Sequence, residues 1–261
     1  MQGIVFAAAV AALVGLIAAI LLAVAAKYMS VPVDEKFPSI RKCLPGANCG
    51  ACGYAGCDGY AGALADGTEE KTNKCIPGGK TTADELSRLF GKEAEPITER
   101  VAFVRCSGSN EATGKKAEKL GYKTCKAAGL SFGGDGLCRF GCLRYGDCAD
   151  ACPSDAIRII NGVAKINQNV CTGCGVCVNT CPRKLIMLIE KKELPKVACM
   201  NEDKGAVTRK ICTAGCIGCG LCMRNCPAEA IQVKNALASI DETKCIGCNT
   251  CKSVCPSNCI H

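Results

Sequence analysis

The chain has 261 residues, a formal net charge of +8, 26 cysteines, no tryptophan and only 4% aromatic residues. So few aromatic side chains exclude a large, conventionally packed core, and so many cysteines indicate disulfides or metal ligands instead. The positive charge would suit a nucleic-acid-binding protein, but this count treats every cysteine as neutral, and metal-bound thiolates would reverse its sign. We therefore expect no nucleic acid among the partners.

Residues 4–26 form an uninterrupted apolar run near the N-terminus. At ~1.5 Å per residue, a helix of this length exceeds the ~30 Å hydrocarbon thickness of a bilayer, which predicts a transmembrane helix over residues 1–27. A buried core helix and a cleaved signal peptide are the alternatives, but the run is apolar on every face and no basic segment precedes it. Basic residues follow the run, which predicts a single-pass protein of the cytoplasmic (inner) membrane, in contact with lipid and with its bulk on the cytoplasmic side. These residues are Lys27, Lys36, Arg41 and Lys42.

An extended linker is expected over residues 28–42, because Pro32 and Pro38 disfavour helix there. A small four-Cys domain follows over residues 43–80, with its thiols so closely spaced that they converge on one centre instead of bridging distant strands. We interpret them as ligands of one 4Fe-4S cluster, with zinc as the alternative. The spacing is Cys49-x2-Cys52-x4-Cys57-x17-Cys75.

Residues 81–132 form a connector of helices and strands. Thr82 and Glu85 match a capping box, which predicts a helix from Thr82 to Gly91. Val101–Val104 is expected to be a strand that leads to Cys106, and Glu111–Leu120 a helix closed by Gly121.

The remaining residues divide into two ferredoxin-like modules, residues 133–195 and 196–261. A shift of 74 residues superimposes six cysteines of the first module on six of the second without a gap, so each copy should fold as one unit. Short apolar stretches at Ala156–Ile159 and Ala230–Val233 predict a small hairpin in each module. The superimposed cysteines are Cys148, Cys152, Cys171, Cys174, Cys177 and Cys181, and, in the same order, Cys222, Cys226, Cys245, Cys248, Cys251 and Cys255.

Three copies of the bacterial ferredoxin run Cys-x2-Cys-x2-Cys-x3-Cys-Pro begin at Cys171, Cys216 and Cys245. In such a run three thiolates on one loop bind one cubane, and the fourth thiolate binds the neighbouring cluster. Zinc is disfavoured, because each zinc knuckle usually supplies two cysteines and leaves the third without a use. The expected sets are Cys216, Cys219, Cys222 with Cys255; Cys245, Cys248, Cys251 with Cys226; Cys171, Cys174, Cys177 with Cys152; and Cys138, Cys142, Cys148 with Cys181.

Six cysteines lie outside these sets, and four of them are candidate ligands of a sixth cluster. Cys106 and Cys199 end similar strands, and each is followed by a second cysteine, at Cys125 and Cys212. Separate buried thiols are the alternative, and the 74-residue shift instead equates Cys125 with Cys199 and Cys138 with Cys212. No role is assigned to Cys43 or Cys259. No phosphate loop, dinucleotide motif or haem motif is present, so we expect five 4Fe-4S clusters, with the sixth as an open question, and no nucleotide or flavin.

The stretch Leu44-Pro-Gly-Ala-Asn-Cys49-Gly-Ala-Cys52-Gly-Tyr-Ala-Gly-Cys57, with the apolar run before it and the ferredoxin repeats after it, resembles the B subunit of the Rnf complex. The resemblance covers essentially the whole chain and implies an α+β fold with one N-terminal transmembrane helix, the four-Cys domain and duplicated two-cluster modules. It implies an electron-transfer subunit of a membrane oxidoreductase that moves electrons between reduced ferredoxin and NAD and exports sodium ions or protons. Its partners would be reduced ferredoxin and the other Rnf subunits. The shorter members of that family carry one ferredoxin module, so the second module of this chain is a departure from them.

The resemblance implies no bond chemistry by this chain and no catalytic residue. A polyferredoxin of another membrane oxidoreductase and a zinc-binding membrane-anchored adaptor are the alternative functions. Ferredoxins are usually acidic, so docking would require basic residues near an exposed cluster. Two groups qualify: Lys115, Lys116, Lys119, Lys123 and Lys126; and Lys191, Lys192, Lys196, Arg209 and Lys210.

Overall fold

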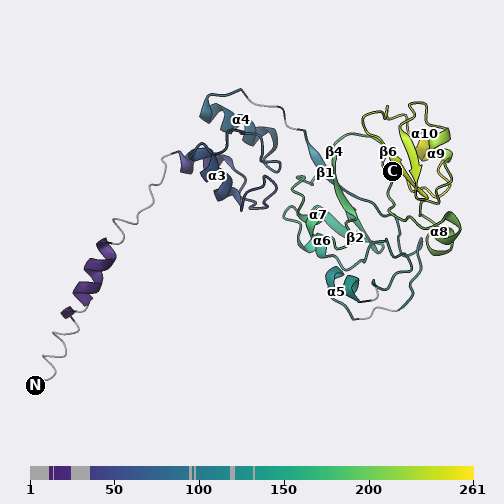
Figure 1. The fold of residues 1–261 in the computed structure, drawn as a ribbon, viewed down its shortest axis with the longest axis horizontal. Coiled ribbons are helices and arrows are strands. Elements are labelled where there is room, and N and C mark those ends of the chain that lie inside the picture. Colours follow the sequence, from purple (N-terminus) through teal and green to yellow (C-terminus); the bar gives the residue numbers. More distant parts are fainter. Residues whose placement is uncertain are drawn as a thin grey trace, which may run out of the picture.

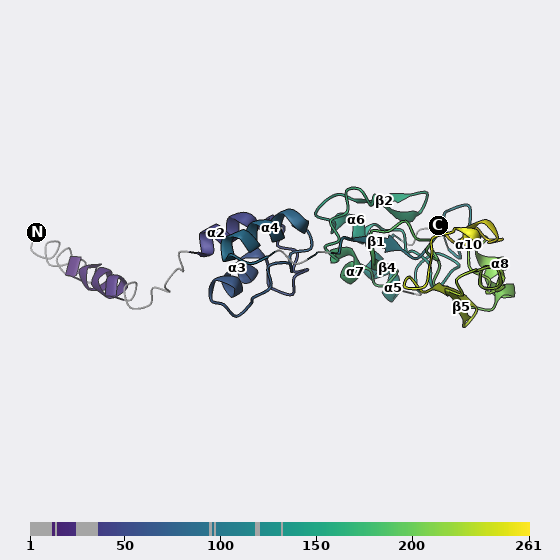
Figure 2. The same cartoon turned by 90° about the horizontal axis from the view of Figure 1, so that it is seen from above.

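A computed structural model of the chain describes residues 12–13, 15–24, 36–93, 96, 98–117, 121–131 and 133–261. After the N-terminal segment come a helical four-Cys domain and two small modules of short helices and two-stranded sheets (Figure 1). From above, the domain and the two modules lie in a row (Figure 2). The first module therefore occupies the middle of the row.

The predicted transmembrane helix at residues 1–27 lies mostly outside the described residues. Within it, residues 12–13 and 15–24 are helical, and their large apolar side chains are exposed. Across the described ranges, no helix combines the length and apolarity that a membrane crossing requires.

The four-Cys domain packs α2 (Phe37–Cys43), α3 (Cys57–Ala65) and α4 (Gly79–Phe90) around a small apolar core. Ile40 and Leu86 are fully buried there, and so is Tyr60, whose hydroxyl donates to the Lys71 carbonyl at 2.6 Å. Each such apolar side chain contributes roughly 1.5–3 kcal/mol by leaving water. The domain therefore has a core of its own besides its cysteines.

Two expectations about this region were wrong. Residues 37–43 are helical instead of extended, because Pro38 lies in the first turn of α2, where its missing N–H is not needed. Helix α4 begins at Gly79 without a side-chain cap, and Thr82 inside it donates to the Cys43 carbonyl at 3.1 Å. The predicted end of this helix is confirmed, since Gly91 adopts the left-handed conformation that closes it.

Part of the expected connector packs with the first module, because β1 (Arg100–Val104) pairs antiparallel with β4 (Ile186–Glu190). From here on, the first module includes this part of the connector, so that its start and end lie side by side. The hairpin β2 (Ile157–Ile160) and β3 (Val163–Ile166) turns at Asn161-Gly162, both with positive φ, as a type I′ turn requires. Three short helices complete the module: α5 (Cys125–Leu130), α6 (Asp147–Asp150) and α7 (Val176–Thr180).

The predicted helix at Glu111–Leu120 was wrong over the residues of it that the structure describes. Thr113 instead forms a bridge with Cys212, and Lys115 forms one with Gly136. The Thr113 hydroxyl also donates to the Ile211 carbonyl at 2.7 Å. The backbone groups of this stretch therefore connect the two modules instead of closing a helix.

The second module repeats this plan with α8 (Gly205–Ile211), α9 (Leu221–Arg224), the hairpin β5 (Ile231–Lys234) and β6 (Leu237–Ile240), and α10 (Thr250–Ser253). Val197 bridges Ile260, so this module is also closed by pairing its start with its end. Both hairpins were predicted and are confirmed. Cysteines make up a large part of the buried clusters of both modules, and the side chains around them are small or aliphatic.

Candidate cluster-binding sites

The four cysteines of the N-terminal domain surround one pocket. Cys49 and Cys52 lie on the loop before α3, Cys57 begins α3, and Cys75 precedes α4. Cys75 is close enough to the other three sulfurs to interact with them electrostatically. We call this group the N site: Cys49, Cys52, Cys57 and Cys75.

The expected set that includes Cys152 also comes together. Cys177 interacts electrostatically with Cys174, Cys171 and Cys152. The loop of this set is tightly packed, because a Cβ at Gly173 would lie 2.2 Å from the Arg100 carbonyl oxygen and 3.4 Å from Ile76 of the N-terminal domain. We call this group outer site 1: Cys152, Cys171, Cys174 and Cys177.

The other group in the first module differs from the sequence-based set. Cys125 lines the pocket with Cys142, Cys148 and Cys181, and Cys138 does not. Cys125 is held there by α5, where the Asp147 carboxylate accepts the backbone N–H groups of Cys125 at 2.6 Å and Lys126 at 3.1 Å. We call this group inner site 1: Cys125, Cys142, Cys148 and Cys181.

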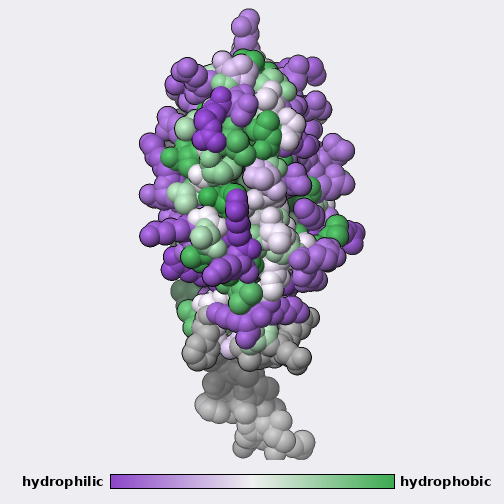
Figure 3. All heavy atoms as spheres, turned by 90° about the vertical axis from the view of Figure 1, so that its right-hand side faces the viewer, coloured by the Kyte–Doolittle hydropathy of each residue, from purple (hydrophilic) through white to green (hydrophobic). Residues whose placement is uncertain are grey.

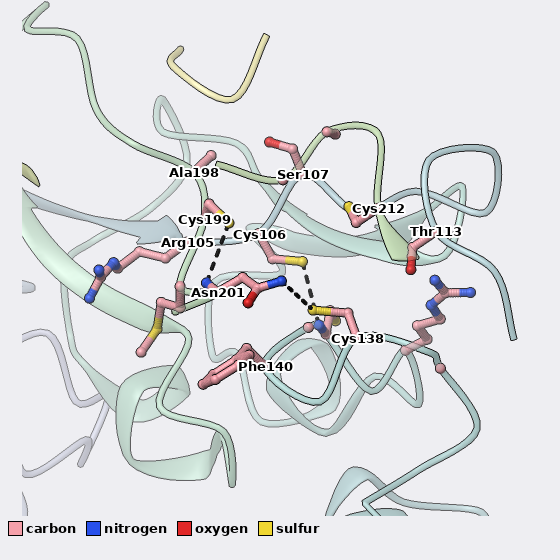
Figure 4. A pocket seen from close by; sticks show the side chains of 18 residues that line it. Arg105, Cys106, Ser107, Thr113, Cys138, Phe140, Ala198, Cys199, Asn201 and Cys212 are labelled. Atoms are coloured by element: carbon pink, nitrogen blue, oxygen red, sulfur yellow. Dashed lines mark hydrogen bonds between the residues drawn. The ribbon is translucent and has the colours of Figure 1, made fainter. Parts of the chain in front are cut away.

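Cys138 instead lies at the junction of the two modules. It lines a pocket there with Cys106, which follows β1 by two residues, and with Cys199 and Cys212 from the second module (Figure 4). Asn201 is almost fully buried beside them; its backbone N–H lies 3.4 Å from the Cys199 sulfur and its Nδ2 lies 3.9 Å from the Cys138 sulfur (Figure 4). We call this group the junction site: Cys106, Cys138, Cys199 and Cys212.

The second module brings together one expected set and three cysteines of the other, with the fourth nearby. Cys222 interacts electrostatically with Cys216, Cys219 and Cys255, which line one pocket. Cys251 interacts with Cys245 and Cys248, and Cys226 packs against the same buried cluster. We call these groups inner site 2 (Cys216, Cys219, Cys222 and Cys255) and outer site 2 (Cys226, Cys245, Cys248 and Cys251).

Backbone N–H groups point at the sulfurs in several of these sites. Ala102 donates to Cys171, Cys142 to Cys106 and Ala238 to Cys216, each at 3.4 Å. Burial raises the pKa of the Cys148 thiol to about 12 and that of the Cys177 thiol to about 11. A buried thiolate without a cation is therefore unfavourable, whereas N–H donors around an anionic sulfur suit a cluster ligand. Among the described residues, no three Cys, His, Asp or Glu side chains are placed to hold a single metal ion.

A pattern in the sequence indicates that Cys125, and not Cys138, lies in inner site 1. The 74-residue repeat also relates Cys142 to Cys216 and Tyr145 to Cys219, so the first module carries a ferredoxin run in which tyrosine replaces the second cysteine. Cys125 supplies the missing thiol, and its sulfur accepts a hydrogen bond from the Tyr145 backbone.

Cys43 and Cys259, to which the sequence assigned no role, lie in different surroundings. The Cys43 thiol donates to the Ser39 carbonyl at 3.4 Å. Cys259 is buried in the pocket of inner site 2, where its hydrogen bond to Cys216 lowers the pKa of the latter.

Family models match the four-Cys domain and most of the two modules. The model described as "Putative Fe-S cluster" matches residues 44–77, which contain the N site. Models of 4Fe-4S dicluster domains match residues 136–182, 170–231 and 209–261. The chain therefore carries several 4Fe-4S clusters.

The fold and its sites define a multi-cluster iron-sulfur electron-transfer protein. The chain is 41% identical over 94% of its length to the B subunit of the Na(+)-translocating ferredoxin:NAD(+) oxidoreductase complex of Acetobacterium woodii, and covers 74% of it. It is 38% identical over 93% of its length to the B subunit of the proton-translocating complex of Clostridium ljungdahlii, covering 86% of it, and 34% identical over 90% to the Methanosarcina acetivorans protein, covering 89%. The chain belongs to the B-subunit family of these ion-translocating (Rnf) oxidoreductase complexes and is their iron-sulfur electron-transfer subunit.

Proposed function

We propose that all six groups bind 4Fe-4S clusters, with the ligand sets that the structure groups together: the N site, outer site 1, inner site 1, the junction site, inner site 2 and outer site 2. A cubane requires four thiolate ligands, and each group supplies four cysteines. Backbone N–H groups directed at the sulfurs also suit bound thiolates, which supports this fit. Each cluster would take up and release one electron. The thiolates would hold it in place, while the surrounding apolar side chains exclude water and the N–H groups stabilise charge on sulfur.

We further propose that electrons pass along the six sites in a single row. The observation that carries this proposal is a series of electrostatic interactions and hydrogen bonds between cysteines of neighbouring sites. Cys49 of the N site interacts with Cys174 of outer site 1, and Cys177 of outer site 1 interacts with Cys148 of inner site 1. The row then continues into the junction site, because the Cys142 backbone of inner site 1 donates to the Cys106 sulfur at 3.4 Å.

The junction site connects the two modules. Cys199 belongs to this site, and its sulfur lies next to the backbone of Cys216, the first cysteine of inner site 2. Outer site 2 shares a buried cluster with inner site 2, in the module that lies at the end of the row opposite the four-Cys domain (Figure 2). Without the junction site, the two modules would hold two separate pairs of clusters, so this site is what makes the row continuous.

The partners we propose are reduced ferredoxin, the other subunits of an Rnf complex, and membrane lipid. The names of the relatives above refer to ferredoxin and NAD(+) and to translocation of Na(+) or protons. We propose a membrane helix at residues 1–27, supported by the apolar run, and a cytoplasmic position for the rest of the chain. The charge pattern after the run supports this orientation.

Of the two candidate docking groups for ferredoxin, we propose the first, because three of the five residues of the second group already form ion pairs. In the second group, Lys191 pairs with Glu99, Lys192 with Glu190, and Lys196 with Glu242. Lys123 and Lys126 of the first group are exposed on both sides of Cys125, near Leu130, whose side chain is 84% exposed. An apolar side chain among lysines suits an acidic protein partner.

The cluster content can be measured directly. Anaerobically purified protein should be brown and contain about 24 iron and 24 acid-labile sulfide atoms per chain, four of each for every site. EPR of the dithionite-reduced protein should show interacting clusters, because neighbouring sites contact each other. Colourless protein with a few zinc ions and no sulfide would overturn the proposal.

A further inference from the structure

Inner site 2 contains a fifth thiol besides its four proposed ligands. Cys259 is 2% exposed, and its sulfur lies 3.6 Å from the Cys255 sulfur. Its side chain also forms a hydrogen bond with the Cys216 sulfur. Cys216 and Cys255 would bind a cluster as thiolates, which carry no proton to donate, so the Cys259 S–H is the donor in both hydrogen bonds.

The repeat provides a natural comparison for Cys259. The residue 74 positions earlier is Leu185, which is equally buried at 2% and lines inner site 1. The backbone is closely similar at the two positions. A residue with positive φ precedes each of them, and the carbonyls accept from Arg105 at 2.8 Å in the first module and Ala198 at 2.7 Å in the second.

The backbone donors to the equivalent ligand sulfurs also correspond. Cys216 accepts from the backbones of Gly218 and Ala238, and Cys142 accepts from those of Arg144 and Ala164, the residues 74 positions earlier. Next to these sulfurs, inner site 2 therefore has an S–H donor at the position where inner site 1 has a methyl-bearing side chain.

We infer that Cys259 is a positioning residue that raises the reduction potential of inner site 2 by donating its S–H to the ligand sulfurs. This inference rests on the proposed function, because it requires a cluster at that site. Reduction there adds one electron from the neighbouring carrier, changes the charge of the ligated cluster from about −2 to about −3, and moves no proton. A donor to sulfur stabilises the more negative state, so reduction becomes easier.

The test uses the full-length protein and two reciprocal substitutions. Cys259→Leu installs the first-module side chain, and it should lower the potential of one cluster in an EPR-monitored redox titration while the iron content stays unchanged. A change in the reduction equilibrium on the order of fivefold is expected from one hydrogen bond, or ~40 mV at ~59 mV per tenfold change. Leu185→Cys should raise the potential of inner site 1. Cys259→Ser keeps a donor and should remain close to the unsubstituted protein.

Cys43→Ser is the matched control, because it removes a thiol that donates to a carbonyl instead of a ligand sulfur. Its titration should match that of the unsubstituted protein. Unchanged potentials in both Cys259→Leu and Leu185→Cys, with full iron content, would overturn this inference alone. Loss of one cluster in Cys259→Leu would also overturn it, by showing that Cys259 is a ligand. Absence of clusters from the unsubstituted protein would overturn the proposed function as well.

Discussion

The backbone N–H of Cys216 lies 3.3 Å from the sulfur of Cys199 and donates to it. One residue belongs to inner site 2 and the other to the junction site, so a single hydrogen bond connects two neighbouring centres. Cys199 follows the segment that pairs with Ile260, which fixes its position relative to the second module. The junction site is thus attached firmly to a site whose ligands all come from the second module.

Paired substitutions distinguish the structural grouping of the cysteines from the sequence-based one. Cys138→Ser with Cys212→Ser should remove one cluster, about 4 iron atoms, because both residues belong to the junction site. Cys125→Ser with Cys212→Ser should remove two clusters, about 8 iron atoms, because Cys125 belongs to inner site 1. Iron and sulfide analysis of the purified variants measures both. The opposite result would restore the grouping expected from the sequence.

Arg183 should raise the potentials of the two centres beside it. Burial lowers the pKa of its guanidinium, which interacts with the sulfurs of Cys138 and Cys181 and donates to the Gly133 carbonyl at 2.6 Å. Arg183→Ser, which installs the residue found 74 positions later, removes a positive charge and should lower these potentials by roughly tens of millivolts. Redox titration measures the shift. Arg183→Lys keeps the charge, so an equal shift in that variant would contradict the electrostatic explanation.

Charge reversal should locate the ferredoxin surface. Lys123→Glu with Lys126→Glu should slow reduction by an acidic ferredoxin ~3–10-fold at low salt and weaken the dependence of the rate on salt. Lys191→Glu with Lys192→Glu is the matched control, since both lysines are exposed but already paired with glutamates. Stopped-flow kinetics with reduced ferredoxin measures the rates. A larger effect in the control pair would show that ferredoxin docks near Lys191 and Lys192 instead.

Deletion of residues 1–27 should release a soluble, brown protein whose EPR spectrum matches that of the full chain. A reporter fused after His261 should be active in the cytoplasm, because basic residues follow the apolar run. Fractionation and reporter activity measure the two outcomes. A reporter active only on the opposite side of the membrane would refute the proposed orientation.

Removal of the clusters should affect the domain and the modules differently. The four-Cys domain keeps an apolar core that includes Ile40, Tyr60 and Leu86, whereas cysteines make up much of the buried clusters of the modules. After treatment with an iron chelator under oxidant, amide exchange should become fast throughout both modules. In α3 and α4 some protection should remain. Equal protection in all three parts would show that the modules fold without metal.

The sequence predicts those features that depend on local spacing. The hairpins, the strand before Cys106 and the ferredoxin runs all follow from residues within one short segment. The structure groups Cys125 differently from the sequence, because its position depends on a contact between distant segments. Its backbone N–H, at the start of α5, donates to the carboxylate of Asp147, the first residue of α6. The helix expected at Glu111–Leu120 was wrong for a related reason, since Thr113 pairs with Cys212 of the other module.

The end of the molecule that carries the second module is mainly hydrophilic, with hydrophobic side chains scattered among the charged ones (Figure 3). Cys219 and Cys248 are exposed in this module, and Ile246 is 67% exposed. In the proposed row, electrons would leave or enter at this end without crossing a thick layer of protein.

The ligands of the junction site come from positions 106 to 212, on both sides of the complete set for outer site 1. A chain emerging from the ribosome presents the N site first, then both sites of the first module, and only then Cys199 and Cys212. The junction site can therefore receive its cluster only after the first part of the second module has been synthesised. Truncated nascent chains that end before Cys199 should acquire every earlier cluster and lack this one, which iron analysis of stalled products can show.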